Sequence, residues 1–214
     1  MRRDDEPINR DQIVQAALEI VDEGGNGDLS MRAVAKRVDR HVSSLYNHVT
    51  NRAELVELLS AHIVKGIDVS GFAALPWPQA LAQWSKSYVT EFVAHPNLVQ
   101  ILATSPVRDL PTLIMYETMM TSLSAQGWSV REAVLVIRTV EAHAWGSVFD
   151  IVAPQPDIAV YESTPGYDAI QALVTTEPAE YGAWASFEAG LQALIDGLEI
   201  RHDALVEQGV VARA

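Results

Sequence analysis

Two short amphipathic segments around a tight turn, within residues 29–52, constrain the fold of this chain more than any other feature. Ser30 is placed to cap a first helix, and Val34 and Val38 repeat on one face of that helix. Asp39 then interrupts the pattern, and a second short helix follows. This arrangement predicts a helix-turn-helix, a motif that places its second helix in a groove of DNA.

The predicted second helix has an apolar underside, formed by Val42, Leu45, Tyr46 and Val49, and a polar start and outer face. Polar side chains on such a helix can reach base edges and phosphates, although an ordinary solvated helix surface has a similar composition. Six side chains project from the polar face: Arg40, His41, Ser43, Ser44, Asn47 and His48.

The runs LSMRAVAKR, SSLYNHV and NRAELVELL resemble the amino-terminal domain of the tetracycline-repressor (TetR) family, over roughly residues 9–63. The resemblance implies that Tyr46, His48 and Arg52 bind phosphates and so fix the position of the protein on DNA. It also implies that five side chains approach base edges: Arg32, Arg40, Val42, Ser43 and Ser44. Arg32 is equally well placed to bind a phosphate.

One position departs from the resemblance. The family commonly has glycine in the turn between the two helices, where this chain has Asp39. Aspartate enters the left-handed backbone region without large strain, so we expect the turn to form. Its charge is unfavourable near a phosphate, and Arg40 is placed to offset it.

The composition is that of an ordered globular chain. Of its 214 residues, 49% are hydrophobic and 20% charged, so we expect disorder only at the ends. The absence of cysteine excludes disulfides and thiolate metal sites. The start lacks the apolar region of a secretory signal, and no apolar run is long enough to span a bilayer. We therefore expect a soluble cytoplasmic protein that does not bind membranes.

The formal charge of −13 is unfavourable for binding DNA, but the charge is unevenly distributed. Residues 28–52 carry five basic and two acidic side chains, whereas residues 53–214 carry seven basic and nineteen acidic ones. Charges farther apart than a Debye length of about 8–10 Å are largely screened at physiological salt. A basic tip can therefore dock on DNA, while the acidic body opposes non-specific binding.

Helix signals outside this motif predict an all-α chain with two domains. Asn9 begins a capping signature for a first helix, and Asn51 begins another for a fourth. We expect an N-terminal three-helix helix-turn-helix DNA-binding domain over residues 1–55. A larger helical-bundle ligand-binding and dimerisation domain follows over residues 56–214, and the helix that starts at residue 51 links the two.

Proline and glycine residues divide the larger domain into further helices. A loop is expected before the helix that carries Trp84, and breaks follow at residues 95–96, 105–106 and 127. The Pro-rich residues 153–165 predict a long surface loop. No segment alternates strictly enough to predict a strand.

Two apolar seams with spacings typical of packed helices lie in the larger domain. One comprises Val134, Ile137, Ala144 and Val148, and the other comprises Trp184, Phe187, Leu191, Leu194 and Leu198. The spacing alone is equally consistent with packing inside one chain. The resemblance favours a homodimer interface, since TetR repressors dimerise through two C-terminal helices. A two-fold dimer would also present two recognition helices to a palindromic operator.

The resemblance further implies an effector cavity with apolar walls and a few polar groups. The side chains expected to line it are Trp84, Tyr88, Met115, Met119, Glu141 and His143. Core packing requires the same residue types, so most large apolar side chains of this domain are expected to be core. The effector is expected to be a small, largely apolar molecule.

No catalytic signature is present in the sequence. The chain lacks a G-x-S-x-G turn, an H-E-x-x-H helix and a phosphate-binding glycine loop, and its histidines lack metal-site spacing. We expect no enzyme, no cofactor and no metal. The favoured hypothesis is a ligand-responsive repressor that is released from its operator by an effector. The alternatives are a regulator whose larger domain binds a protein and, third, an all-helical enzyme.

Overall fold

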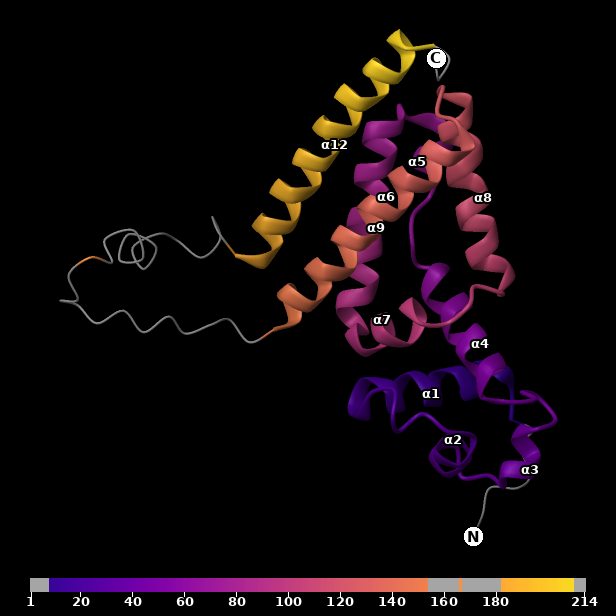
Figure 1. The fold of residues 1–214 in the computed structure, drawn as a ribbon. Coiled ribbons are helices and arrows are strands. Elements are labelled where there is room, and N and C mark those ends of the chain that lie inside the picture. Colours follow the sequence, from indigo (N-terminus) through magenta and orange to yellow (C-terminus); the bar gives the residue numbers. More distant parts are fainter. Residues whose placement is uncertain (1–7, 154–165, 167–181, 210–214) are drawn as a thin grey trace.

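The computed structural model describes residues 8–153, Gly166 and residues 182–209, and this part of the chain is all-α, as predicted. Figure 1 shows a small helical unit at one end of the molecule and a helix that links it to a larger bundle. The helices are α1 (Arg10–Gly24), α2 (Met31–Arg37), α3 (Val42–Leu45), α4 (Arg52–Val64), α5 (Gly71–Ala74), α6 (Trp77–Ala94), α7 (Pro96–Ala103), α8 (Leu110–Ala125), α9 (Val130–Val152) and α12 (Ala183–Glu207).

Side-chain caps fix where the first helices begin. The Asn9 side chain accepts a hydrogen bond from the Gln12 amide, and the Gln12 side chain accepts one from the Asn9 amide, which confirms the predicted capping box. Ser30 caps α2 in the same way, at 3.1 Å from the Ala33 amide. At α4, Asn51 accepts from the backbone amide three residues later, so this predicted cap is also present.

The small unit has its own apolar core. Ile13 and Ala17 of α1, Val34 of α2, Leu45 of α3 and Leu55 of α4 are all fully buried. Regular helix α3 ends at Leu45, earlier than the predicted second helix, because the next amides bond irregularly. The amides of residues 48 and 49 both donate to the Leu45 carbonyl, so a tighter turn continues the chain.

Helix α4 belongs to both parts of the molecule. It contacts α1 in the small unit and α7 and α8 in the larger bundle, and Figure 1 shows it rising from one to the other. The predicted domain boundary after residue 55 falls inside this helix. Displacement of α4 must therefore change the packing of both parts.

The larger bundle packs around α6 and α9. Helix α9 contacts both α6 and α12, and the fully buried Trp84, Phe92, Met119 and Phe187 fill the spaces between the helices. The prolines at 96 and 106 separate helices as predicted, and a short helix, α5, lies within the segment predicted to be a loop. Apart from Ala153, the predicted loop over residues 153–165 lies outside the described residues.

Asp39 forms the turn of the helix-turn-helix in a left-handed conformation, with φ of 52°. The Arg40 amide donates to the Ala35 carbonyl at 2.9 Å, and the Asp39 amide donates to the Lys36 carbonyl at 3.2 Å. These two bonds form a Schellman motif, a helix ending that places a left-handed residue, usually glycine, just after the helix. The sequence expectation that aspartate supports this turn is confirmed.

The left-handed conformation predicts how substitutions at this position affect stability. The Cβ atom raises the free energy of the left-handed conformation by about 1–2 kcal/mol for most residues, whereas glycine has no Cβ. The Asp39→Ala variant should therefore be less stable than Asp39→Gly by about 1 kcal/mol in urea unfolding. Equal stability of the two variants would show that the turn does not hold this conformation in solution.

Candidate nucleic-acid interface and ligand cavity

The helix-turn-helix presents most of its predicted DNA contacts to solvent. Tyr46, whose spacing placed it on the apolar underside of the second helix, is instead 52% exposed, as the TetR resemblance requires. Other exposed side chains are Arg32, His41, Ser43 and Asn47, while Arg40, Val42, Ser44 and His48 are half-buried. These nine residues share one small region of the chain and are accessible to a large partner.

A shallow depression lies between α2 and α3. Its lining includes Arg32, Lys36 and Arg40, with Asp39 as the single carboxylate. Three basic side chains around one concave surface suit the negative backbone of nucleic acid. Lys36 is an exposed base near the end of α2 that the sequence analysis did not select as a contact.

Arg37 does not contribute to this basic surface. Its guanidinium forms ion pairs with Glu19 at 3.1 Å and Glu23 at 2.5 Å, both from α1. Hydrogen bonding to Arg37 lowers the pKa of the Glu23 carboxyl. The local positive charge expected from composition is therefore partly neutralised within the small unit, and α2 is held against α1.

Arg52, predicted to bind phosphate, makes hydrogen bonds within the protein. Its Nε donates to the Leu29 carbonyl at 3.1 Å, and its Nη2 donates to the backbone and side chain of Asn26. Arg52 thus connects the first turn of α4 to the loop that precedes α2. It also lines the cavity described below.

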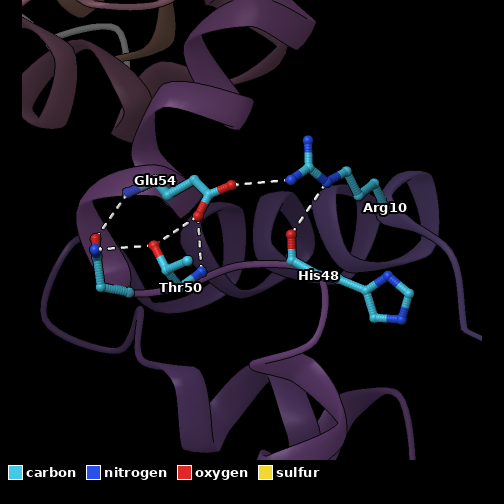
Figure 2. Close-up of polar contacts among 5 residues, drawn as sticks. Arg10, His48, Thr50 and Glu54 are labelled. Atoms are coloured by element: carbon cyan, nitrogen blue, oxygen red, sulfur yellow. Dashed lines mark hydrogen bonds and ion pairs between the residues drawn. The ribbon is translucent and has the colours of Figure 1, made fainter.

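Arg10 and Glu54 form a polar clamp that the sequence analysis missed (Figure 2). The Arg10 guanidinium donates to the His48 carbonyl and to Glu54 Oε1, at 3.0 Å each. Glu54 Oε2 accepts from the amide and the hydroxyl of Thr50, at 2.7 Å each. The Thr50 bonds and Arg10 lower the pKa of Glu54. The clamp therefore holds the end of the recognition segment, residues 42–49, between α1 and α4.

The lowered pKa of Glu54 predicts a pH-dependent loss of stability. The clamp contributes fully above the ordinary value of 4.5 and is lost as the pH falls through the lower folded-state value. At neutral pH, Glu54→Gln should destabilise the protein by about 1 kcal/mol in urea unfolding. The difference from wild type should shrink as the pH falls below 4.5.

Glu57→Gln provides a matched control for this prediction, because Glu57 lies three residues later on the same helix and the contacts of the clamp do not include it. Its substitution should change stability less and with a weaker dependence on pH. An equal loss of stability in the two variants would show that the effect is not specific to Glu54 and would contradict the clamp.

A cavity of about 210 Å³ lies between α4, α6, α8 and α9 and the segment that joins α7 to α8. Among the six predicted ligand contacts, Tyr88, Met115 and Glu141 line it. Trp84 and Met119 are fully buried in the core outside the lining. His143 also lies outside it, where its ring contacts α12 and Nε2 is 3.0 Å from the Phe187 carbonyl oxygen.

A hydrogen-bonded network of aromatic side chains surrounds Glu141 in this cavity. Tyr116 donates to Glu141 Oε1 at 2.6 Å, and Tyr88 donates to the same oxygen at 3.3 Å. The Trp145 indole donates to the Tyr88 hydroxyl at 2.6 Å. Burial raises the pKa of Glu141, and burial together with the nearby Glu141 raises the pKa of both tyrosines.

Sequence spacing did not identify Tyr116 and Trp145 as part of the cavity wall. Both side chains are half-buried and line the cavity. The inner faces of these helices therefore contain cavity-lining residues as well as core residues. Trp145 lies four residues after Glu141 on α9, and Tyr116 lies on α8. The packing of these two helices brings both side chains to the cavity, and the spacing along the sequence does not show this.

The two apolar seams pack largely within the single chain. Ile137, Ala144, Val148, Phe187, Leu191 and Leu198 are buried, and the helices that carry them, α9 and α12, contact one another. Val134 and Trp184 are 42% and 44% exposed, and Leu194 is half-buried. The six buried residues therefore support the intrachain interpretation, and a second protein could reach only the exposed ones.

The described residues, 8–153, 166 and 182–209, form neither a metal-binding cluster nor a membrane-spanning helix. No group of three or more His, Asp or Glu side chains among them is arranged to hold a metal ion. No helix among them is both long and apolar enough to cross a membrane.

Comparison with known proteins identifies relatives along most of the chain. Residues 76–202 match the model of the tetracyclin repressor-like C-terminal domain family. An HTH-type transcriptional regulator of Saccharopolyspora erythraea is 25% identical over 89% of this chain and 84% of its own length. The tetracycline repressor protein class D of Escherichia coli is 25% identical over 94% of this chain and 93% of that protein.

Solved structures share the fold. Apo ActR from Streptomyces coelicolor has a TM-score of 0.71 at 23% identity and covers 93% of this chain and 98% of its own. TetR from Acinetobacter baumannii AYE has a TM-score of 0.66 at 25% identity, with 91% and 98% covered.

The fold and the exposed helix-turn-helix are those of a DNA-binding transcriptional regulator, in agreement with the names of these relatives. The family match covers more than half of the chain. The chain belongs to the TetR family of transcriptional regulators, which confirms the resemblance drawn from its amino-terminal residues.

Proposed function

We propose that the chain is a cytoplasmic homodimeric repressor that binds a palindromic operator and releases it when a small molecule enters the cavity. The observation that carries the proposal is the position of α4, which lines the cavity and packs against α1 of the DNA-binding unit. A ligand that favours one position of α4 must shift the equilibrium between operator-binding states. Among the relatives, solved structures of ActR with actinorhodin and of a TetR variant with minocycline support a small-molecule effector.

The cavity also favours a small molecule over a protein as the regulatory partner. A larger domain that recognises only proteins needs no internal space, whereas this one has a cavity of about 210 Å³ with apolar, aromatic and charged side chains in its wall. The protein-binding alternative therefore has less support from the structure.

Arg52 provides a specific route for coupling. The side chain borders the cavity and bonds to Leu29 and Asn26, in the loop before α2. Movement of the start of α4 would therefore displace the point where the helix-turn-helix begins. We assign Arg52 this coupling role in place of the predicted phosphate contact, while Tyr46 and His48 remain the proposed phosphate contacts and Arg32, Arg40, Val42, Ser43 and Ser44 the proposed base contacts.

Dimerisation is proposed to use the side chains that α9 and α12 leave exposed. Val134 and Leu135 of α9 are 42% and 44% exposed, and Trp184 and Ile200 of α12 are 44% and 73% exposed. Apolar side chains of this size at the surface of two adjacent helices favour association with a second chain. A two-fold dimer would place two recognition segments on successive turns of DNA.

Selection of genomic DNA fragments by the purified protein tests this function. We expect enrichment of one palindrome, with binding that weakens between about 50 and 200 mM salt. Tyr46→Ala should reduce affinity for that palindrome by roughly fivefold, because it removes one proposed phosphate contact while leaving the core unchanged. Leu113→Ala, with similar exposure on α8, should retain wild-type affinity. Retention of random fragments alone would contradict the proposal.

The salt dependence of operator binding separates the two roles considered for Arg52. Removing a cation that contacts phosphate lowers the slope of log affinity against log salt by about one, so Arg32→Ala should lower it if Arg32 binds phosphate. Arg52→Ala should weaken binding with little change in slope, because its guanidinium bonds within the protein. A slope reduced by about one in Arg52→Ala would restore the phosphate role.

A further inference from the structure

We propose that the effector carries a protonated amine or a similar organic cation, which pairs with Glu141 inside the cavity. This inference rests on the proposed function, since it assigns the effector to the cavity lined by α4, α6, α8 and α9. It also replaces the expectation of a largely apolar ligand with an amphipathic one.

The first argument is the unused acceptor of Glu141. Both tyrosine hydroxyls donate to Oε1, at 2.6 and 3.3 Å, and among the described residues no group donates to Oε2. Glu141 as a residue is 7% exposed, and it lines the cavity. Buried carboxylates in proteins are ordinarily paired or fully hydrogen-bonded, so this oxygen is suited to a donor supplied by a ligand.

The second argument is the charge balance of the cavity wall. The lining contains two arginines, Arg52 and Arg108, and three carboxyls, Glu57, Asp109 and Glu141. Arg52 donates to Leu29 and Asn26, and Asp109 caps α8 through the Thr112 amide. With all groups ionised the wall carries one excess negative charge, which favours a cationic over an anionic ligand.

Burial raises the pKa of Glu141, and this effect exceeds the opposing effects of the tyrosine hydrogen bonds and of Arg138, a basic group on the same helix. An ionised Glu141 is therefore under-compensated in the ligand-free protein. A cation beside Oε2 would stabilise the carboxylate, and the carboxylate would in turn stabilise the bound cation.

The third argument is the aromatic part of the cavity wall. Tyr88 and Phe92 of α6, Tyr116 of α8 and Trp145 of α9 all line the cavity, with the Tyr88 and Phe92 ring centroids 4.7 Å apart. Aromatic faces attract organic cations, and they also pack against the apolar part of such a molecule. A carboxylate and four aromatic rings in the wall of one cavity provide the chemistry that recognises an ammonium group.

The cavity size sets the scale of a suitable probe. A dry cavity of about 150 Å³ accommodates benzene. The present cavity, at about 210 Å³, therefore has room for one aromatic ring with a short chain. Phenylpropylamine, phenylpropanol and phenylpropionate share this skeleton and carry a cation, a neutral hydroxyl and an anion at the same end.

Calorimetric titration of the purified full-length protein with these three compounds, without DNA, tests the proposal. We expect the amine to bind at least about tenfold more tightly than the alcohol, and the anion to bind most weakly. In Glu141→Gln, the preference for the amine over the alcohol should fall to within about twofold. Unchanged affinity of that variant for the alcohol, with cooperative thermal unfolding, shows that its cavity is intact.

Glu57→Gln is the matched control, because it lowers the charge of the same cavity wall by the same amount as Glu141→Gln, whereas the tyrosine hydroxyls bond to Glu141. It should reduce the preference for the amine by less than Glu141→Gln does. Equal loss in Glu57→Gln and Glu141→Gln overturns the assignment to Glu141. Equal binding of the three compounds, tighter binding of the anion, or no binding by any of them overturns the cation proposal.

Genomic DNA selection and the release of the selected operator by the amine distinguish a failure of the cation site from a failure of the proposed repressor function. Selective amine binding without operator release supports the cation site and contradicts the effector role of the cavity. Palindrome selection together with a preference for the anion supports the repressor and overturns the cation site.

Discussion

The packing of α4 against two sets of helices is the constraint on which the rest of the structure depends. Its first turn completes the core of the helix-turn-helix through Leu55, and its later turns border α8 and the cavity. Because α4 packs against both units, a movement of this helix changes its contacts with the DNA-binding unit and with the larger bundle together. The ligand cavity and the DNA-contacting surface are consequently connected by ordinary packing, and Arg52 adds a polar connection at the end nearest the recognition segment.

The features predicted well from sequence are those with local causes. The caps at Asn9 and Ser30 and the left-handed turn at Asp39 depend on residues a few positions apart, so spacing and side-chain chemistry were sufficient. The Arg10–Glu54 clamp joins residues 44 positions apart, and no local pattern specifies which distant carboxylate an arginine will meet. Arg52 resembles a phosphate ligand in the family pattern, yet its partners become visible only in the folded chain.

Cavity and interface residues were predicted less completely for a related reason. Helical periodicity identifies the buried face, but it does not distinguish a side chain in solid core from one beside an empty space. Trp84 and Met119 belong to the first kind, and Tyr88 and Met115 to the second. The same ambiguity affects the seams of α9 and α12, since spacings of three and four residues serve intrachain packing and dimer contacts equally.

The ties within the small unit have a consequence for the speed of regulation. Arg37 joins α2 to α1, and Arg10 joins α1 to the end of the recognition segment, around a fully buried apolar core. A DNA-reading unit held together in this way changes position without losing its internal shape. When the small molecule dissociates, the protein can rebind DNA without a refolding step, so the time needed to silence the promoter again would follow clearance of that molecule.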